Sequence, residues 1–350
     1  MSDQPRLTAA QILASYDGPR LRIMEVCGTH THEIFRLGIR KLLPPQVDLI
    51  SGPGCPVCVT PVGFLDEAIW LAEHGVTITT FGDLVRVPGT TKNLADARAA
   101  GARVQVVYSP LDALAYAKEH ADEQVTFLSV GFETTVPAAC LVAKQALAEG
   151  VENFSLLTAN KTMPNAYAAL RESADVFLYP GHVHAITGTA LCEELAEQGV
   201  SGVLAGFTAK ELVTALAVAV RKSEEGKPFF VNAYPRVVRP EGTPAAVTLM
   251  QEIMEPVDAE WRGLGVIPQS GLQLRDEYAS IDARKRFDMP RIEGRANPAC
   301  RCGEVLQGHC KPSDCPLCGK VCTPQHPVGA CMVSGEGACS AYYQYGGDQL

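Results

Sequence analysis

Short apolar or β-branched runs alternate with longer amphipathic stretches over the first two thirds of the chain. Eight runs are predicted to be strands, at residues 21–26, 47–51, 76–81, 104–108, 125–130, 155–158, 176–179 and 202–205. Stretches of helical length follow several of them, at residues 61–74, 91–100, 136–149 and 208–222. Strands that alternate with helices in this way form mainly parallel sheets. The pattern therefore predicts an α/β fold.

The eight strands fall into two groups of four, separated by a polar stretch near residues 121–124. Each group is expected to form one βα-repeat domain with its own mainly parallel sheet. Past residue 222 Pro and Gly recur, and one helix is predicted at residues 244–255. The chain is therefore divided into an N-terminal helical segment (1–20), two α/β domains (21–122 and 123–222) and a C-terminal domain (223–350). We expect the last domain to be held together by metal rather than by a large core.

The charge of the chain argues against a nucleic-acid partner. Lys and Arg number 30 against 39 Asp and Glu, which gives a net charge of −9, whereas neutralising a phosphate backbone requires a basic surface. The longest near-continuous apolar stretch, residues 212–220, is half of what a membrane-spanning helix needs. The Ser-Asp-Gln opening carries no secretion signal, so we expect a cytoplasmic protein without a membrane span.

Cysteine is the unusual component of the composition. The 13 cysteines are odd in number, and without a secretion signal such a set favours metal or redox chemistry over a disulfide framework. Five of them precede residue 300, namely Cys27, Cys55, Cys58, Cys140 and Cys192. Eight lie in the last 51 residues, namely Cys300, Cys302, Cys310, Cys315, Cys318, Cys322, Cys331 and Cys339. Two separate thiol sites are therefore predicted.

The first two predicted strands run into loops that contain cysteine. Cys27-Gly-Thr-His-Thr-His follows the first strand, and Gly-Pro-Gly-Cys55-Pro-Val-Cys58 follows the second. Ligands of open parallel sheets collect at the carboxyl ends of the strands, so neighbouring strands would bring three thiols to one crevice. Thr60 and Pro61 predict a helix start just after Cys58. The partial positive charge of that helix end is expected to lower the pKa of the Cys55 and Cys58 thiols.

The spacing of its cysteines does not decide the chemistry of this first thiol site. A Cys-x-x-Cys between strand and helix suits thioredoxin-like redox chemistry and half of a zinc site equally well. The third thiol, with His30 or His32 nearby, extends the choice to iron or cuprous copper. The histidines are the weaker candidates, because a loop histidine more often serves as a hydrogen-bonding or capping residue.

Polar residues at the ends of later strands are further candidates. Glu133 follows the fifth predicted strand and His182 the seventh, so both are expected to face the crevice. Cys140 and Cys192 lie on apolar helix faces and are predicted to be core residues. Nucleotide fingerprints are not met, because Gly52-Pro-Gly54 lacks a third glycine at position 57 and no P-loop string occurs.

The cysteine-rich tail contains more thiols than one metal ion needs. Cys315-x-x-Cys318 is its single Cys-x-x-Cys knuckle, whereas zinc ribbons pair two knuckles, so zinc is not favoured. The spacing also departs from the ferredoxin run. Four thiolates drawn from the eight nevertheless suit a 4Fe-4S cluster chemically, and the residues alone leave the two metals open.

Five motifs together resemble the HypD family of hydrogenase formation proteins. They are C-G-T-H-T-H at 27–32, G-P-G-C-P-V-C-V-T-P at 52–61, G-F-E-T-T at 131–135, P-G-H-V at 180–183 and C-T-P-x-x-P-V-G-A-C-M-V-S-x-E-G-A-C at 322–339. The resemblance spans nearly the whole chain. It implies two βα-repeat domains plus a cysteine-rich C-terminal iron–sulfur domain, which together act as a scaffold for the Fe(CN)2CO unit of nickel–iron hydrogenase.

The resemblance also implies roles for individual residues. Cys27, Cys55 and Cys58 match the family's iron-site and redox thiols, and the 4Fe-4S ligands correspond to Cys315, Cys322, Cys331 and Cys339. Beside the resemblance, Glu133 and His182 are assigned, from their place at the strand ends, to proton handling or support across the cleft, and His30 is a further catalytic candidate. Cys318 departs from the family, which has an apolar aromatic residue at this position, and Cys300, Cys302 and Cys310 are additional thiols.

The implied partners are other maturation proteins. They are a small HypC-type chaperone that shares the iron, HypE, which presents cyanide as a thiocyanate formed with HypF, and indirectly the hydrogenase large subunit. Releasing cyanide from a thiocyanate consumes two electrons, which a dithiol can supply. The hypothesis is a relay from the cluster through Cys55 and Cys58 to the iron-bound acceptor. The alternatives are a general thiol-disulfide oxidoreductase fed by an iron–sulfur cluster and a zinc-stabilised binding protein.

Overall fold

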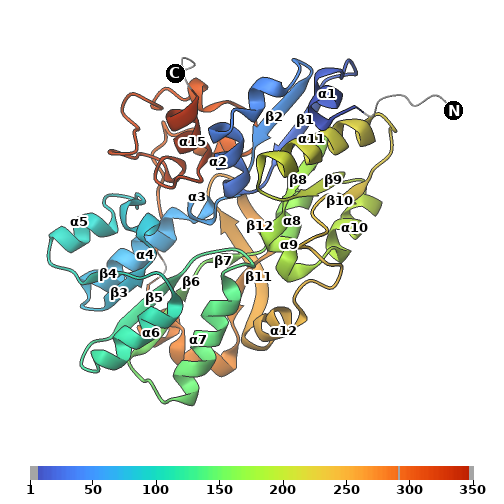
Figure 1. Ribbon diagram of the computed structural model, residues 1–350. Helices are drawn as coiled ribbons and strands as arrows, with labels where there is room; N and C mark the ends of the chain where they lie inside the picture. Colours follow the sequence, from blue (N-terminus) through green and yellow to red (C-terminus); the bar gives the residue numbers. More distant parts are fainter. Residues whose placement is uncertain (1–6, 291, 347–350) are drawn as a thin grey trace.

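The computed structural model describes residues 7–290 and 292–346, and these residues form three sheets (Figure 1). Sheet A has five parallel strands: β10 (Phe230–Asn232), β9 (Gly202–Ala205), β8 (Val176–Pro180), β1 (Leu21–Glu25) and β2 (Val47–Ser51), in that spatial order. Sheet B has four, β4 (Val104–Val106), β3 (Thr77–Thr80), β5 (Val125–Ser129) and β6 (Phe154–Thr158), also parallel. All eight predicted strands are present, and the α/β class with mainly parallel sheets is confirmed.

The third sheet is antiparallel and was not predicted. Sheet C joins β11 (Met254–Trp261), β12 (Gly265–Leu274) and the short β7 (Asn160–Lys161). The hairpin lies between the two parallel sheets in Figure 1. Exposed and partly buried positions alternate along much of β11, so its apolar signal is weaker than that of the fully buried strands of sheet B.

The helices connect and cover the strands. Those up to the end of sheet B are α1 (Ala9–Ala14), α2 (Gly28–Arg36), η1 (Ile39–Leu42), α3 (Pro56–Val59), α4 (Val62–Glu73), η2 (Gly82–Arg86), α5 (Leu94–Ala99), α6 (Pro110–Glu119) and α7 (Val136–Ala148). The later ones are α8 (Met163–Ala169), α9 (Gly181–Thr187), α10 (Ala190–Glu197), α11 (Ala209–Ser223), α12 (Pro244–Ile253), η3 (Asp276–Ile281), α13 (Ala283–Arg286), α14 (Cys302–Leu306), η4 (Pro312–Asp314), η5 (Ala330–Met332) and α15 (Ala338–Tyr345). Capping boxes at Thr8, Asn93 and Thr208 fix the starts of α1, α5 and α11.

The predicted grouping of the strands is wrong. The first two and the last two predicted strands share sheet A, and the middle four form sheet B, so the predicted boundary near residues 121–124 falls within sheet B. Ile23 of β1 lies opposite Leu49 on one side and Val176 on the other, and all three side chains are buried. The local pattern of apolar residues predicts that a segment is a strand. Which strand it pairs with depends on burial between residues far apart in sequence, and the local pattern carries no information about that.

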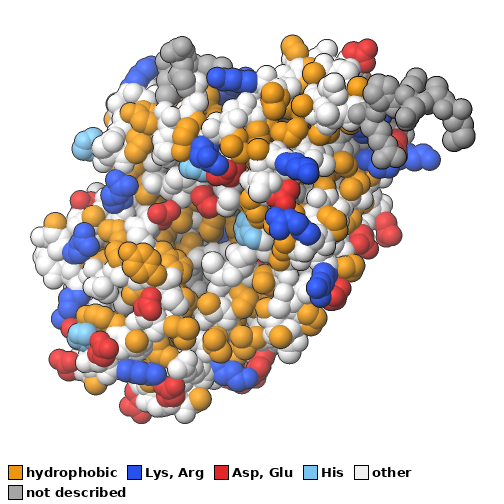
Figure 2. All heavy atoms as spheres, viewed as in Figure 1, with side chains coloured by type: hydrophobic (Ala, Val, Ile, Leu, Met, Phe, Trp, Pro, Cys, Tyr) orange, Lys and Arg blue, Asp and Glu red, His pale blue; other side chains and the backbone are white. Residues whose placement is uncertain are grey.

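The N-terminal helical segment is only partly described. Within residues 7–20 the structure contains α1, whose Leu13 is fully buried against sheet A and α11. Residues 1–6, which include the Ser-Asp-Gln opening, lie outside the described residues. None of the helices in the described part of the chain has the length and hydropathy that crossing a bilayer requires. Figure 2 shows basic and acidic side chains interspersed over the visible face.

The region after residue 222 contributes more to the core than expected. Met254, Leu274 and Ile281 join the core of sheet B, and Trp261 and Ile267 join the core that surrounds the thiols. The Trp261 side chain is fully buried, its indole N–H donates to Ser270 Oγ at 2.7 Å, and its ring stacks on Phe132 at 5.8 Å. The hairpin therefore attaches the C-terminal region by apolar packing.

Backbone contacts hold the carboxyl ends of β1 and β2 together. The Gly28 N–H donates to the Gly54 carbonyl at 2.9 Å, and the Gly52 N–H donates to the Glu25 carbonyl at 2.8 Å. A Cβ added at Gly54 would lie 2.1 Å from the backbone nitrogen of Cys27. Only glycine therefore allows the two cysteine-bearing loops to approach this closely.

Replacing Trp261 tests the role of the hairpin in the core. Trp261→Ala is expected to lower the free energy of unfolding by about 3–5 kcal/mol, because the cavity it leaves is fully buried. Val266→Ala, on the same hairpin but 66% exposed, should change it by less than about 0.5 kcal/mol. Denaturant unfolding measures both, and equal effects of the two substitutions would contradict the packing described.

A second substitution tests the contact between the two loops. Gly54→Ala is expected to lower the free energy of unfolding by about 1–3 kcal/mol or more, because backbone atoms of Cys27 cannot move aside as a side chain can. Gly82→Ala is the control, since its nearest neighbour would lie 3.7 Å from the new Cβ. Denaturant unfolding compares the two, and alkylation of the thiols of Cys27 and Cys55 should be faster in the Gly54 variant alone.

Candidate metal and thiol site

Cys27 lies at the carboxyl end of β1, where it is the N-cap of α2. Its thiol is buried and approaches His182 Nδ1 at 3.9 Å. Burial raises the pKa of the Cys27 thiol to about 12, although hydrogen bonds from the backbone N–H groups of His30 and Thr29 act to lower it. Burial also lowers the pKa of His182 to about 4. At neutral pH this pair is therefore a thiol beside a neutral imidazole, and the thiolate forms when a cation takes the place of the proton.

Cys55 and Cys58 lie at a short helix, α3, that was not predicted, whereas the helix predicted to begin at Thr60 and Pro61 is present as α4 with Pro61 as its N-cap. Cys55 is the N-cap of α3, and its sulfur accepts the Cys58 N–H at 3.4 Å. The predicted lowering of the thiol pKa is wrong for Cys58, whose pKa burial raises well above its ordinary value. A helix of four residues has a weak dipole, whereas full burial penalises the thiolate strongly.

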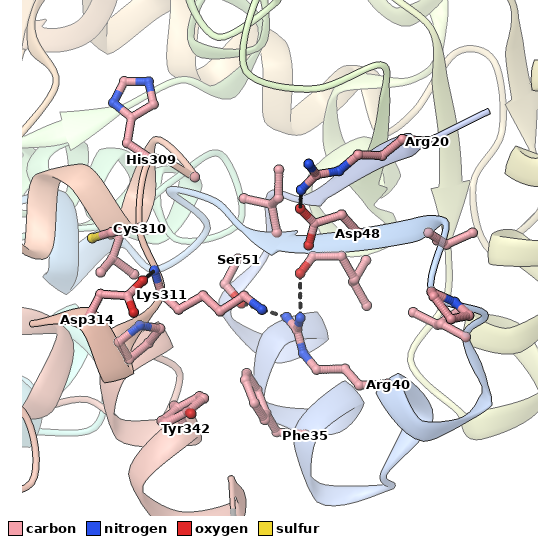
Figure 3. Close-up of a pocket in the computed structure, with 18 of the residues that line it drawn as sticks. Arg20, Phe35, Arg40, Asp48, Ser51, His309, Cys310, Lys311, Asp314 and Tyr342 are labelled. Carbon is pink, nitrogen blue, oxygen red and sulfur yellow. Dashed lines mark hydrogen bonds and ion pairs between the residues drawn. The ribbon is translucent and has the colours of Figure 1, made fainter. Parts of the chain in front are cut away.

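A partly buried ion pair between Arg40 and Glu25 lies beside the ends of β1 and β2. The Arg40 guanidinium donates to Glu25 Oε1 at 3.0 Å. It also donates to Ser51 Oγ at 3.0 Å and to the Leu49 carbonyl, two residues that line the pocket of Figure 3. Glu25 is the last residue of β1 and Ser51 the last of β2. Arg40 therefore joins the strands just before the two cysteine loops. Arg40 also lines a cavity of about 480 Å³, and Cys310 and Lys311 of the cysteine-rich tail line the same cavity.

The tail thiols reach the first site. Cys302 Sγ donates to Cys331 Sγ at 2.7 Å, and Cys331 also contacts the thiols of Cys58 and Cys339. Cys339 in turn accepts from Cys318. The expectation of two separate thiol sites is therefore wrong, because Cys58 and Cys331 connect them into one continuous set.

The remaining tail cysteines differ in burial. Cys315 and Cys322 are buried, and the Val328 N–H donates to Cys322 Sγ at 3.3 Å. Cys300 is only partly buried, and its pKa is raised by burial and by the nearby thiols of Cys302, Cys315 and Cys322. Cys310, also partly buried, lines the cavity of Figure 3.

The donor set fits an iron–sulfur cluster chemically. All 13 cysteines are free thiols, and six of the eight in the tail are buried. Among the residues that the structure describes, no group of three His, Cys, Asp or Glu side chains is arranged to hold a metal ion. Soft thiolates that are already grouped and dehydrated suit iron–sulfur clusters, and they would also accept zinc.

Two of the predicted polar residues, His30 in α2 and Glu133 after β5 of sheet B, are buried. His30 Nε2 lies 3.0 Å from the Gly206 carbonyl, and burial lowers the pKa of His30 to about 3. Glu133 Oε1 accepts the Met163 N–H at 2.9 Å, and Oε2 has no partner among the described residues. Burial raises the pKa of Glu133 to about 7. Glu133 can therefore exchange a proton near neutral pH.

Two charged residues at the site were not predicted. Glu336 accepts the Thr29 hydroxyl at 2.7 Å, and its charge raises the pKa of Cys27. Arg262 is buried with Nη1 unpartnered in the described residues. The hydrogen bond with Cys331 lowers the pKa of Cys302, and the charge of Arg262 lowers it further. Glu336 lies inside the quoted tail motif, which was a usable signal, whereas nothing around Arg262 in the sequence distinguishes it from a surface arginine.

Comparisons with known proteins agree with these motifs. The family model described as HypD, "Hydrogenase formation hypA family", matches residues 6–346. The chain is 44% identical to a hydrogenase maturation factor HypD of Rhizobium leguminosarum bv. viciae, over 97% of this chain and 92% of that protein. It is 43% identical to the same factor of Escherichia coli K12, over 95% and 91%. A putative hydrogenase expression/formation protein of Methanocaldococcus jannaschii is 39% identical, over 93% and 92%. The chain therefore belongs to the HypD family of hydrogenase maturation factors.

Proposed function

We propose that this chain acts in hydrogenase maturation as the scaffold on which the Fe(CN)2CO unit of nickel–iron hydrogenase is assembled. Iron arrives as substrate and is shared with a HypC-type chaperone, and HypE delivers cyanide that is prepared with HypF. The hydrogenase large subunit receives the finished unit. The observation that carries this proposal is the contact of the Cys55 and Cys58 pair with Cys331, beside the loop of Cys27.

Cys27, Cys55 and Cys58 are assigned as the thiolates that hold the iron. Their loops touch through Gly54, and all three thiols are buried. Because burial disfavours a free thiolate, the Cys27 proton leaves only when a metal cation compensates the negative charge. Thiolate ligands in a dry site favour ferrous iron that carries soft, strong-field cyanide and carbonyl ligands.

Cyanide release from a protein thiocyanate is assigned to the Cys55 and Cys58 dithiol. The thiocyanate accepts two electrons and becomes a thiolate and cyanide, while the two thiols lose two electrons and two protons and form a disulfide. His182, at 3.9 Å from Cys27, and Glu133, with a pKa of about 7, are assigned to proton handling around the site. His30 supports α2 from its buried contact with Gly206.

Recovery of the dithiol is assigned to the tail. Cys331 contacts Cys58 on one side and Cys302 at 2.7 Å on the other, so Cys302 and Cys331 form a second dithiol able to exchange with the first. A 4Fe-4S cluster, when bound, supplies single electrons to this region. Of the four ligands that the family resemblance implies, Cys331 is the one whose contacts favour the redox role instead.

A general thiol-disulfide oxidoreductase is the second candidate. Such a protein must present a nucleophilic thiol to disulfides of many partners. Cys58 is 0% exposed and Cys55 is 3% exposed, so neither thiol is presented at the surface to the disulfides of many partners. The burial of both thiols favours a scaffold that acts on a specifically docked partner. Reduction of insulin disulfides at a rate comparable with that of thioredoxin would favour the oxidoreductase instead.

Cys27→Ala tests the assignment of the iron thiolate. The variant, purified anaerobically with its chaperone, should lose the cyanide and carbonyl infrared bands, because the iron unit has lost one of its thiolates. The visible absorption of the tail cluster should not change. Cys140→Ala removes another fully buried thiol in α7 and should keep the bands. Unaltered bands in the Cys27 variant would show that Cys27 does not hold the iron.

Cys302→Ala tests the second dithiol. With dithionite as reductant, the variant should release about one equivalent of cyanide per chain and then stop, because the Cys55–Cys58 disulfide is no longer reduced. Cys310→Ala, in the cavity of Figure 3, should continue through repeated turnovers. Continued release by the Cys302 variant, measured by cyanide trapping, would rule out the thiol route.

A further inference from the structure

The Glu133 carboxyl is buried, so a proton that it exchanges has to travel through the protein. Its side chain is 3% exposed, and its pKa of about 7 lets it release or take up a proton near neutral pH. Oε1 accepts the Met163 N–H at 2.9 Å, which places the carboxyl at the start of α8. Oε2 has no partner among the described residues, and it is therefore the atom from which a proton can leave.

Tyr167 lies on the same face of α8 as Met163, one turn later along the helix. Helical side chains lean toward the helix N-terminus, so the Tyr167 ring covers the turn that Glu133 contacts. Tyr167 is fully buried, which raises the pKa of its hydroxyl well above the ordinary value, and the charge of Glu133 raises it further. The carboxyl and the phenol are therefore close enough to interact inside the core.

The imidazole of His184 links the Tyr167 hydroxyl to the end of α9. Tyr167 Oη lies 3.4 Å from His184 Nε2, and His184 Nδ1 lies 3.1 Å from the Gly188 carbonyl. Because a carbonyl can only accept, Nδ1 carries the ring proton and Nε2 accepts the Tyr167 hydroxyl. Nδ1 also lies 3.3 Å from Thr187 Oγ1, and Thr187 is only partly buried. The chain of contacts therefore runs from the core toward the surface.

Uncharged groups surround the His184 imidazole at neutral pH. Burial lowers the pKa of His184 to about 4, and His182 on the same helix lowers it further. The Cys192 thiol of α10 lies 3.5 Å from Nε2 and 3.6 Å from Nδ1, and the Tyr179 ring of β8 lies 5.7 Å from the imidazole ring. Burial raises the pKa of both Cys192 and Tyr179. The imidazole therefore does not store a proton, but it can receive one at Nε2 while it releases another at Nδ1.

We propose that Tyr167 and His184 form the proton path between Glu133 and the solvent at the end of α9. This rests on the proposed function only in that Glu133 handles protons of the thiol site. In one passage the Glu133 proton moves to Tyr167 Oη, the Tyr167 proton moves to His184 Nε2, and the Nδ1 proton moves to solvent beside Thr187. Each bond to hydrogen that breaks is replaced by one on the next atom, and no electron is transferred. Uptake of a proton by Glu133 runs the steps in reverse and restores the first tautomer of His184.

Tyr179 provides a matched control for Tyr167. Its ring packs on that of Tyr167 at a centroid distance of 4.6 Å, and its buried hydroxyl has no partner in the part of the chain that the structure describes. Tyr179→Phe therefore removes a phenolic hydroxyl from the same core without interrupting the path.

The experiment measures hydrogen–deuterium exchange of the Glu133 carboxyl in the anaerobically purified full chain, at a pH below the pKa of Glu133. The infrared carbonyl stretch of the protonated carboxyl, identified by its absence from Glu133→Gln, shifts when deuterium replaces the proton. After rapid dilution into deuterium oxide, Tyr167→Phe is expected to exchange about tenfold more slowly or slower still, because a step of the relay is missing. Tyr179→Phe should exchange at the rate of the unsubstituted chain.

His184→Gln interrupts the path at its next step. The glutamine amide can accept the Tyr167 hydroxyl but cannot pass a proton on, so this variant should exchange as slowly as Tyr167→Phe. The path is overturned if either variant exchanges as fast as the unsubstituted chain, or if Tyr179→Phe is slowed equally.

The exchange rate does not depend on cyanide chemistry, so the path and the proposed function can fail separately. Cyanide release by Glu133→Gln is measured in parallel and is expected to be slower than that of the unsubstituted chain. Release at the unsubstituted rate, with the exchange results as expected, would contradict the role of Glu133 in the proposed function and leave the proton path standing.

Discussion

The parallel pairing of β1 with β2 is the constraint on which the site depends. It places the ends of both strands at one edge of sheet A, and Gly54 then lets the two loops touch through their backbones. Cys27 and Cys55 come together for this reason, although 27 residues separate them in sequence. Pairing of β1 with β8 on its other side adds His182 to the same edge.

Burial, rather than helix polarity, determines the state of the thiols. Raising the pKa of Cys27 from 9.0 to about 12 makes its ionisation costlier by about 4 kcal/mol. A charge at a helix terminus gains only about 0.3–1 kcal/mol, so the N-terminus of α2 cannot keep the thiolate. Cys27 and Cys58 are therefore neutral thiols at neutral pH, and ionising either of them requires a compensating positive charge.

The sequence allowed the elements to be predicted better than their partners. The eight strand positions and the approach of the Cys27 loop to the loop of Cys55 and Cys58 follow from local pattern and from the geometry of parallel strand ends. The division of strands between sheets A and B depends on burial between residues more than 100 positions apart, such as Ile23 and Val176. The contact of Cys58 with Cys331 has the same origin. Neither the division of the strands nor this contact could be predicted from the spacing of residues along the chain, because spacing does not tell which distant segments pack together.

The tail is fixed to the same helices that begin at the first thiols. Glu336 accepts from Thr29 in the first turn of α2, Tyr342 of α15 packs edge-on against Phe35 at the other end of α2, and the tail lies beside both α2 and α3 in Figure 1. A small thiol-rich segment gains much of its stability from the metal that it binds. Metal loss in the tail would therefore loosen the cover over Cys27 and Cys58 together. Since dehydration is what keeps Cys27 and Cys58 protonated, a metal held by the tail thiols, as proposed, would influence the first site through this packing.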